Sequence, residues 1–358
     1  MNASATVLAS HTPTIAETLS VRRSAQPLPS PAVLRQRLPL SDALAARIQN
    51  DRNAIRAVLD GRDPRLLVVV GPCSLHDPVA ALEYAERLAA LAPEVSDQLL
   101  LVMRAYVEKP RTTIGWKGLV YDPHLDGSGN MAEGLHLSRR LMLDILETGL
   151  PIATELLQPL AAGYFDDLLG WAAIGARTSE SQIHRELVSG LDLPVGFKNG
   201  TDGGLGIACD AMRSAEHPHQ HFGIDDLGHP ALLHTRGNPD THLVLRGGHG
   251  APNYDAASVA EARRALAKQG IAPRIMVDCS HANSGKDPLR QPAVLESVIE
   301  QRLAGDMSLR GVMLESHLFD GCQPLSDELR YGVSITDGCL GWTATEQMLR
   351  LAAQRLQV

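Results

Sequence analysis

The chain has 358 residues, 44% of them hydrophobic and only 4% aromatic, which is enough for a large aliphatic core in one large domain with an appendage or in two ordinary domains. A formal net charge of −8 argues against nonspecific nucleic-acid binding, and no run of about 18 apolar residues is present to span a membrane. Five scattered cysteines without a C-x-x-C pair form neither a disulfide framework nor a closed zinc site, which favours a reducing cytoplasm.

The N-terminal part differs in composition from the rest. Residues 1–40 are rich in Ala, Ser, Thr and Pro and show little periodicity, which predicts an extended or partly ordered arm. Residues 40–61 have helical spacing of their aliphatic residues, with Ser41 and Asp42 as candidate caps and Gly61 as a stop signal. We therefore expect an N-terminal arm and helix over residues 1–65.

From residue 66 onward, short aliphatic runs alternate with stretches of helical pattern. The predicted strands are 66–71, 99–104, 150–154, 171–176, 193–197, 241–245, 274–278 and 309–314, and the predicted helices are 78–92, 132–148, 160–170, 255–269, 290–303 and 343–356. Eight strands with alternating helices predict an α/β fold of the (β/α)8 barrel type over residues 66–358. An open doubly wound sheet is the alternative, but polar residues after every strand favour the barrel.

Positive charges gather just after the predicted strands. In a barrel the carboxyl ends of all strands meet at one face, so these side chains would share one mouth on a protein of net negative charge. Arginine forks suit phosphate and carboxylate, and one phosphate cannot use so many cations, so more than one anionic group is expected. The alternative is that each cation pairs with a neighbouring carboxylate. The cations are Arg104, Lys109, Arg111, Arg177, Lys198 and Arg246.

A mixed set of metal-binding residue types follows the first, seventh and eighth strands. Thiolate, imidazole and carboxylates together suit a catalytic divalent ion with an open position better than a closed structural zinc. The same region holds the competing candidates His76, Cys279 and His317, which residue type alone does not exclude. The candidate ligands are Cys73, His281, Glu315 and Asp337.

Nine short motifs follow one another from about residue 40 to the C-terminus. They are GPCSLHDP (71–78), MRAYVEKPRTTIGWKGL (103–119), ATE (153–155), GARTSESQIHRE (175–186), PVGFKNGTDG (194–203), LRGG (245–248), DCSHANSGK (278–286), ESHL (315–318) and SITDGCLGW (334–342). In this order they resemble the motifs of the class I 3-deoxy-D-arabino-heptulosonate-7-phosphate (DAHP) synthases, in particular the type regulated by aromatic amino acids.

The resemblance implies a metal-dependent barrel enzyme that condenses phosphoenolpyruvate with erythrose 4-phosphate, the first step of the shikimate pathway. By matching motifs, the metal ligands would be the four candidates above, with Mn2+ favoured and Fe2+, Co2+ or Zn2+ as alternatives. Glu155 would orient the attacking water, and Lys109 or His281 would deliver a proton to the new alkoxide. Phosphoenolpyruvate would be held by Arg104, Lys109, Ala176, Arg177, Lys198 and Arg246, and the aldose phosphate by Lys109, Pro110, Arg111 and Thr112.

The resemblance also implies regulation and assembly. Residues 1–65 would serve oligomerisation or regulation, in a homodimer or homotetramer. An aromatic amino acid is the expected effector, with tryptophan favoured. A related eight-carbon ulosonate synthase and a noncatalytic amino acid sensor are the competing interpretations. The positions that resemble the wall of the effector pocket are Gln158, Pro159, Ala162, Gly163 and Asp192.

Overall fold

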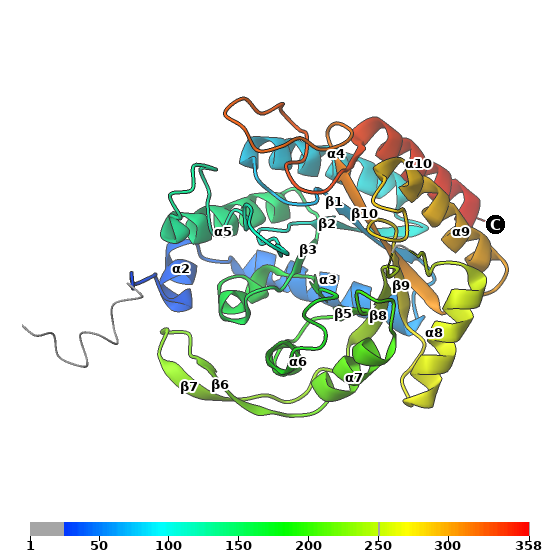
Figure 1. Ribbon diagram of the computed structural model, residues 1–358, viewed down its shortest axis with the longest axis horizontal. Coiled ribbons are helices and arrows are strands. Elements are labelled where there is room, and N and C mark those ends of the chain that lie inside the picture. Colours follow the sequence, from blue (N-terminus) through cyan, green and yellow to red (C-terminus); the bar gives the residue numbers. More distant parts are fainter. Residues whose placement is uncertain (1–24, 250, 358) are drawn as a thin grey trace, which may run out of the picture.

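Eight parallel strands close into a barrel in the computed structural model, which describes residues 25–249 and 251–357 (Figure 1). Neighbouring strands pair in the order β1-β2-β3-β4-β5-β8-β9-β10, and pairing of β10 with β1 closes the ring. The (β/α)8 barrel predicted from the sequence is therefore confirmed. The strands are β1 (Leu66–Gly71), β2 (Leu99–Arg104), β3 (Ile152–Glu155), β4 (Trp171–Ile174), β5 (Val195–Lys198), β8 (Thr241–Leu245), β9 (Ile275–Asp278) and β10 (Leu309–His317).

Helices surround the barrel (Figure 1). The α-helix predicted over residues 160–170 is wrong, because Phe165, with φ −134°, interrupts the helical backbone. Two 3₁₀-helices stand there instead, η1 (Pro159–Tyr164) and η2 (Asp166–Leu168). The outer helices are α4 (Pro78–Val95), α5 (Met131–Glu147), α6 (Gln182–Ser189), α7 (Gly206–Ala215), α8 (Ala256–Lys268), α9 (Gln291–Leu303) and α10 (Trp342–Leu356), with η3 (Pro288–Arg290) before α9.

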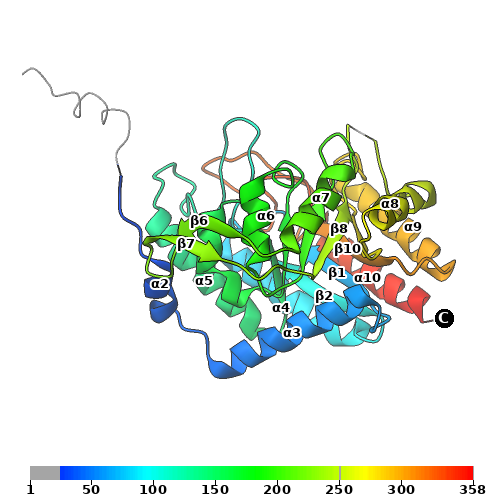
Figure 2. The ribbon, with the colours of Figure 1, turned by 90° about the horizontal axis from the view of Figure 1, so that it is seen from below.

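The predicted N-terminal helix is α3 (Asp42–Asp60), which follows the short α2 (Pro31–Arg37). Ser41 Oγ accepts a hydrogen bond from the Leu44 amide at its start, and Gly61 ends it in the left-handed region, as expected for these cap residues. Figure 2 shows α3 lying across one end of the barrel, opposite the long loops. This helix therefore closes the end of the barrel at which the strands begin.

Three smaller strands lie outside the barrel. β6 (Gln220–Ile224) and β7 (Pro230–His234) form an antiparallel hairpin, and β11 (Leu340–Gly341) pairs in parallel with the last two residues of β10. The hairpin stands at the rim of the molecule in Figure 1. Among the described residues, no helix is long and apolar enough to cross a membrane.

The core has two layers separated by the barrel wall. Alternate residues of each strand point to opposite faces, so Leu67 and Val69 of β1 face inward while Val68 packs outward against the helices. Ile55 and Val58 of α3 pack into the inner cluster from below. The inner cluster also holds Leu59, Val102, Ala153, Trp171, Ala173, Val244, Met276 and Met313.

Candidate active site

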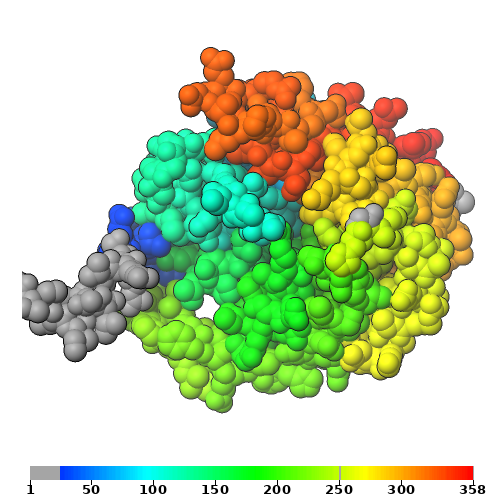
Figure 3. Space-filling model, viewed as in Figure 1, coloured from blue at the N-terminus to red at the C-terminus, as the bar shows by residue number. Residues whose placement is uncertain are grey.

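A charged layer sits directly above the apolar interior. Inward positions recur every second residue along a strand. The residue two places after the last apolar inward residue of each strand therefore also points inward. Two of the eight positions are glycines, Gly71 and Gly175, and a Cβ on Gly175 would lie 2.4 Å from Glu155 Oε1. In Figure 3 the cyan, green, yellow and orange parts of the chain meet near the middle of this face. The charged members are Arg104, Glu155, Lys198, Arg246, Asp278 and Glu315.

Arg104 is the most deeply buried cation of this layer, with 1% of its surface exposed. Its Nη2 lies 3.1 Å from Glu315 Oε1, its Nε donates to the Pro72 carbonyl at 3.3 Å, and its guanidinium stacks on the Tyr106 ring at 3.9 Å. Among the described residues, its buried Nη1 has no hydrogen-bond partner. A buried donor without a partner is costly, so Nη1 is suited to an anionic ligand in the mouth.

Lys109 enters the mouth from the loop after β2. That loop closes on itself, since the Lys109 amide donates to the Lys117 carbonyl at 2.8 Å. Its Nζ lies 2.9 Å from Cys73 Sγ and 3.7 Å from Asp337 Oδ2. Burial alone would lower the pKa of Lys109, but Cys73, Glu315 and Asp337 raise it, so the ammonium stays charged.

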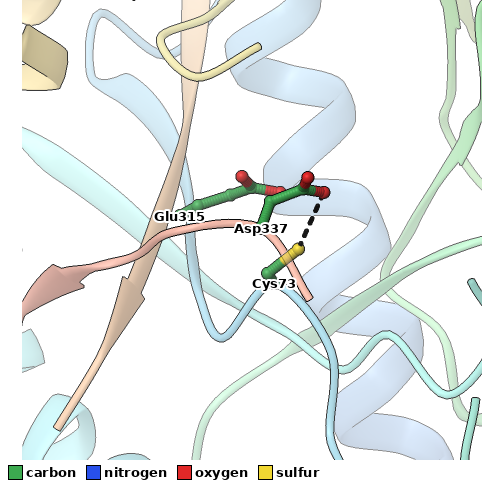
Figure 4. A group of neighbouring side chains, drawn as sticks. All are labelled: Cys73, Glu315 and Asp337. Carbon is green, nitrogen blue, oxygen red and sulfur yellow. Dashed lines mark hydrogen bonds between the residues drawn. The ribbon is translucent and has the colours of Figure 1, made fainter. Parts of the chain in front are cut away.

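Three of the four predicted metal ligands come together. One ligand atom each from Cys73, Glu315 and Asp337 lies within 4.8 Å of the others, and the side chains converge in Figure 4. Burial, with Glu315 second, raises the pKa of the Cys73 thiol to about 12. A divalent cation would favour the thiolate and balance two carboxylates, so this sulfur and oxygen donor set fits a borderline metal ion.

His281 lies beside this group rather than within it. It lines the same small cavity, of about 40 Å³, as Glu315 and Asp337. Its φ of +55° is in the left-handed region, which is uncommon for a residue with a side chain. The structure thus brings His281 to the cavity, while its role as a ligand stays a prediction.

The competing ligand candidates lie elsewhere. His76 and His317 pack edge to face, with ring centroids 6.0 Å apart. Cys279 belongs to the outer apolar cluster between the strands and the helices. None of these three joins the Cys73 group within the described residues.

The remaining predicted substrate residues line the outer part of the mouth. Arg177 Nη1 donates to Thr112 Oγ1 at 2.9 Å, which joins the loops after β4 and β2. Arg111 is exposed, whereas Pro110 and Ala176 are half-buried. These side chains are therefore accessible to a substrate, and their roles in binding it stay predictions.

The sequence analysis overlooked two buried acidic residues, Asp278 in the charged layer and Glu108 in the loop after β2. Asp278 Oδ2 accepts hydrogen bonds from Lys198 Nζ and lies 2.9 Å from His281 Nδ1. Burial opposes ionisation of Asp278, but the neighbouring His281 and Lys198 hold its pKa well below its usual range. Glu108 is buried next to Lys109, and burial raises its pKa to about 7. Strand alternation marks Asp278 as inward, but no comparable signal marks Glu108.

The five predicted effector residues lie on two segments. Gln158, Pro159, Ala162 and Gly163 lie in or next to η1, and the Gly163 carbonyl accepts from Arg35 of α2. Asp192 precedes β5 and pairs with Arg56 of α3 at 2.7 Å. The role of these residues as the wall of an effector pocket stays a prediction.

The fold and this mouth define a class, the (β/α)8-barrel proteins with buried cations and a candidate metal site at the carboxyl ends of the strands. The model of the DAHP synthetase I family matches residues 44–350. The chain belongs to this family.

Known relatives cover almost the whole chain. It is 54% identical over 334 residues to the Tyr-sensitive phospho-2-dehydro-3-deoxyheptonate aldolase of Escherichia coli K12, covering 92% of this chain and 94% of that protein. It is 50% identical to the Phe-sensitive protein of the same organism, covering 91% and 94%. A solved phospho-2-dehydro-3-deoxyheptonate aldolase from Francisella tularensis superposes with a TM-score of 0.92 at 43% identity, covering 94% and 98%. The names of the two Escherichia coli proteins specify tyrosine and phenylalanine, so they do not support the expectation of tryptophan.

Proposed function

We propose that this chain is a DAHP synthase, which condenses phosphoenolpyruvate with erythrose 4-phosphate and water to give DAHP and inorganic phosphate. The observation that carries the proposal is the juxtaposition of buried cations with the Cys73, Glu315 and Asp337 group in one barrel mouth. The names of the relatives support the same reaction.

Two anionic substrates fit two parts of the mouth. Arg104, Lys198 and Arg246 project from strand ends and would hold the phosphate and carboxylate of phosphoenolpyruvate, helped by Arg177 and the Ala176 backbone. The Lys109–Thr112 loop lies farther out, with Arg111 exposed, and would hold the phosphate of the sugar. Holding both substrates and offsetting their repulsion supplies much of the rate enhancement.

The chain's own residues would then guide the protons. As C3 of phosphoenolpyruvate bonds to the aldehyde carbon, the Lys109 ammonium or the His281 imidazole delivers a proton to the developing alkoxide. Glu155, buried at the end of β3, orients the water that adds to C2, after which the phosphate leaves. A divalent cation held by Cys73, His281, Glu315 and Asp337, with Mn2+ favoured, would polarise the aldehyde oxygen.

Regulation by an aromatic amino acid and assembly into a homodimer or homotetramer belong to the same proposal. The N-terminal α2 packs on η1, and Tyr164 Oη donates to the Pro29 carbonyl at 2.7 Å, which links residues 25–65 to the predicted effector wall. The hairpin exposes the cross-strand pair Phe222 and Leu232, at 79% and 62%, as a surface that a second copy would cover.

One assay tests these points. Phosphate release is measured with phosphoenolpyruvate and erythrose 4-phosphate, with and without Mn2+ and chelator, and with tyrosine, phenylalanine or tryptophan added. Arabinose 5-phosphate in place of erythrose 4-phosphate is the control for the eight-carbon synthase. We expect turnover only with the four-carbon sugar, loss with chelator, and inhibition by one amino acid. Turnover that prefers arabinose 5-phosphate, or none at all, would overturn the proposal.

A further inference from the structure

The carboxylate of Asp278 touches both halves of the proposed site. Asp278 ends β9 and is fully buried. Its Oδ2 accepts from Lys198 Nζ at 2.9 Å and lies 2.9 Å from His281 Nδ1. Its Oδ1 accepts from the amide and the hydroxyl of Ser280 at 3.0 and 2.6 Å. Lys198 and Ser280 both offer donors to this carboxylate, so these contacts call for its ionised form.

The contact with Oδ2 assigns the proton of His281. The Ser280 hydroxyl also lies 2.9 Å from His281 Nδ1, but its hydrogen is directed to Asp278, so it too presents an acceptor. Two acceptors around Nδ1 require an N–H there, which leaves the Nε2 lone pair free for a metal ion. The left-handed backbone of His281, with φ +55°, is unfavourable for a residue with a side chain, and the contact with Asp278 helps to hold it.

Lys198 depends on the same oxygen. Its ammonium is buried, and among the described residues Asp278 is the hydrogen-bond partner of Nζ. One of the three ammonium hydrogens is thus anchored, and the others are free to meet an anion. Without Asp278 the lysine would be a buried charge with no partner in the free protein.

We propose that Asp278 is a positioning residue that holds Lys198 toward phosphoenolpyruvate and fixes His281 as a metal ligand. The inference rests on the proposed function. Because one oxygen serves both groups, occupancy of the anion site and affinity for the metal are coupled, and the coupling is reciprocal.

Asp278→Asn tests the proposal with almost no change of volume. An amide that keeps its oxygen toward Ser280 turns its NH2 toward Lys198 and His281, both of which are donors. We expect the dissociation constant for Mn2+ to rise about 10- to 100-fold in the absence of substrate. We expect the dissociation constant for phosphoenolpyruvate, measured on metal-free protein, to rise at least about tenfold. A rise of this size is the effect of losing one charge-assisted contact. Isothermal titration calorimetry measures both without turnover.

The chain offers a matched control in Asp306. Its Oδ1 accepts from the amide and hydroxyl of Ser308 at 3.0 and 2.5 Å, the same Asp-x-Ser turn, but it precedes β10 at the other end of the barrel. Asp306→Asn should bind Mn2+ and phosphoenolpyruvate as the wild type does. If Asp278→Asn weakens only one of the two ligands, or neither, shared positioning is refuted.

A measurement on the wild-type chain covers the case in which Asp278→Asn does not fold. The ¹⁵N NMR shifts of His281 in metal-free protein, assigned by loss of the signal in His281→Asn, report its tautomer at alkaline pH. We expect a protonated Nδ1, and a protonated Nε2 would overturn the inference. A wild type that releases no phosphate from the two substrates would refute the proposed function, whereas an active wild type with unchanged binding in Asp278→Asn would refute this inference alone.

Discussion

Replacement of Glu108 by glutamine should change how stability depends on pH. Glu108 is 4% exposed, its Oε1 accepts from the Tyr121 hydroxyl at 3.2 Å, and its Oε2 faces the Gln158 amide at 3.5 Å. Burial raises its pKa from 4.5 to about 7. The charge of Glu155 adds to this rise, while the hydrogen bonds to Glu108 lower the pKa. Glutamine reproduces the neutral form, since its oxygen can face the amide while its NH2 donates to Tyr121.

The sign and size follow from linkage. A pKa raised in the folded state means that protonated Glu108 stabilises the fold fully below the unfolded pKa, and that this contribution is lost as the pH rises through about 7. The pKa difference corresponds to about 3 kcal/mol in total, of which about 2 kcal/mol falls between pH 5.5 and 8. The free energy of unfolding of Glu108→Gln relative to wild type should therefore increase by about 2 kcal/mol over this interval.

Urea denaturation followed by tryptophan fluorescence, at several pH values and with chelator present, measures this difference. Glu147→Gln, at an exposed position of α5, controls for the removal of one negative charge. A difference between Glu108→Gln and wild type that stays constant with pH, or that decreases as the pH rises, would refute the reasoning.

Three further predictions concern the site and the outer helix α5. Lys109→Met should lower kcat for phosphate release at least about 100-fold while Mn2+ still binds by calorimetry, and wild-type turnover would remove Lys109 from the mechanism. Cys73→Ala should lower Mn2+ affinity at least about tenfold, and unchanged metal content with full activity would exclude Cys73 as a ligand. Gly134→Ala should destabilise the fold by about 1–3 kcal/mol in urea, because its Cβ would lie 2.2 Å from a backbone carbonyl oxygen. Gly206→Ala, where a Cβ meets open space, should show no such loss, and equal effects of the two substitutions would contradict the clash.

The sequence alone was sufficient for the barrel, because each strand is a short aliphatic run that ends in polar residues. The repeat of apolar residues, every second residue in a strand and about every 3.6 residues in a helix, is a local property of the sequence. Helix caps are local too, and the structure confirms Ser41 and Gly61 as the caps of α3. The same local logic failed over 160–170, where helical composition did not reveal the backbone break at Phe165.

Only the tertiary structure decided which charged side chains meet. Cys73 and Asp337 are 264 residues apart, and Lys198 and Asp278 are 80 apart, so their contacts depend on closure of the whole ring. The alternation of inward and outward residues along a strand can be predicted from the sequence. The partner of an inward charge cannot, because it depends on which strand end lies across the closed barrel.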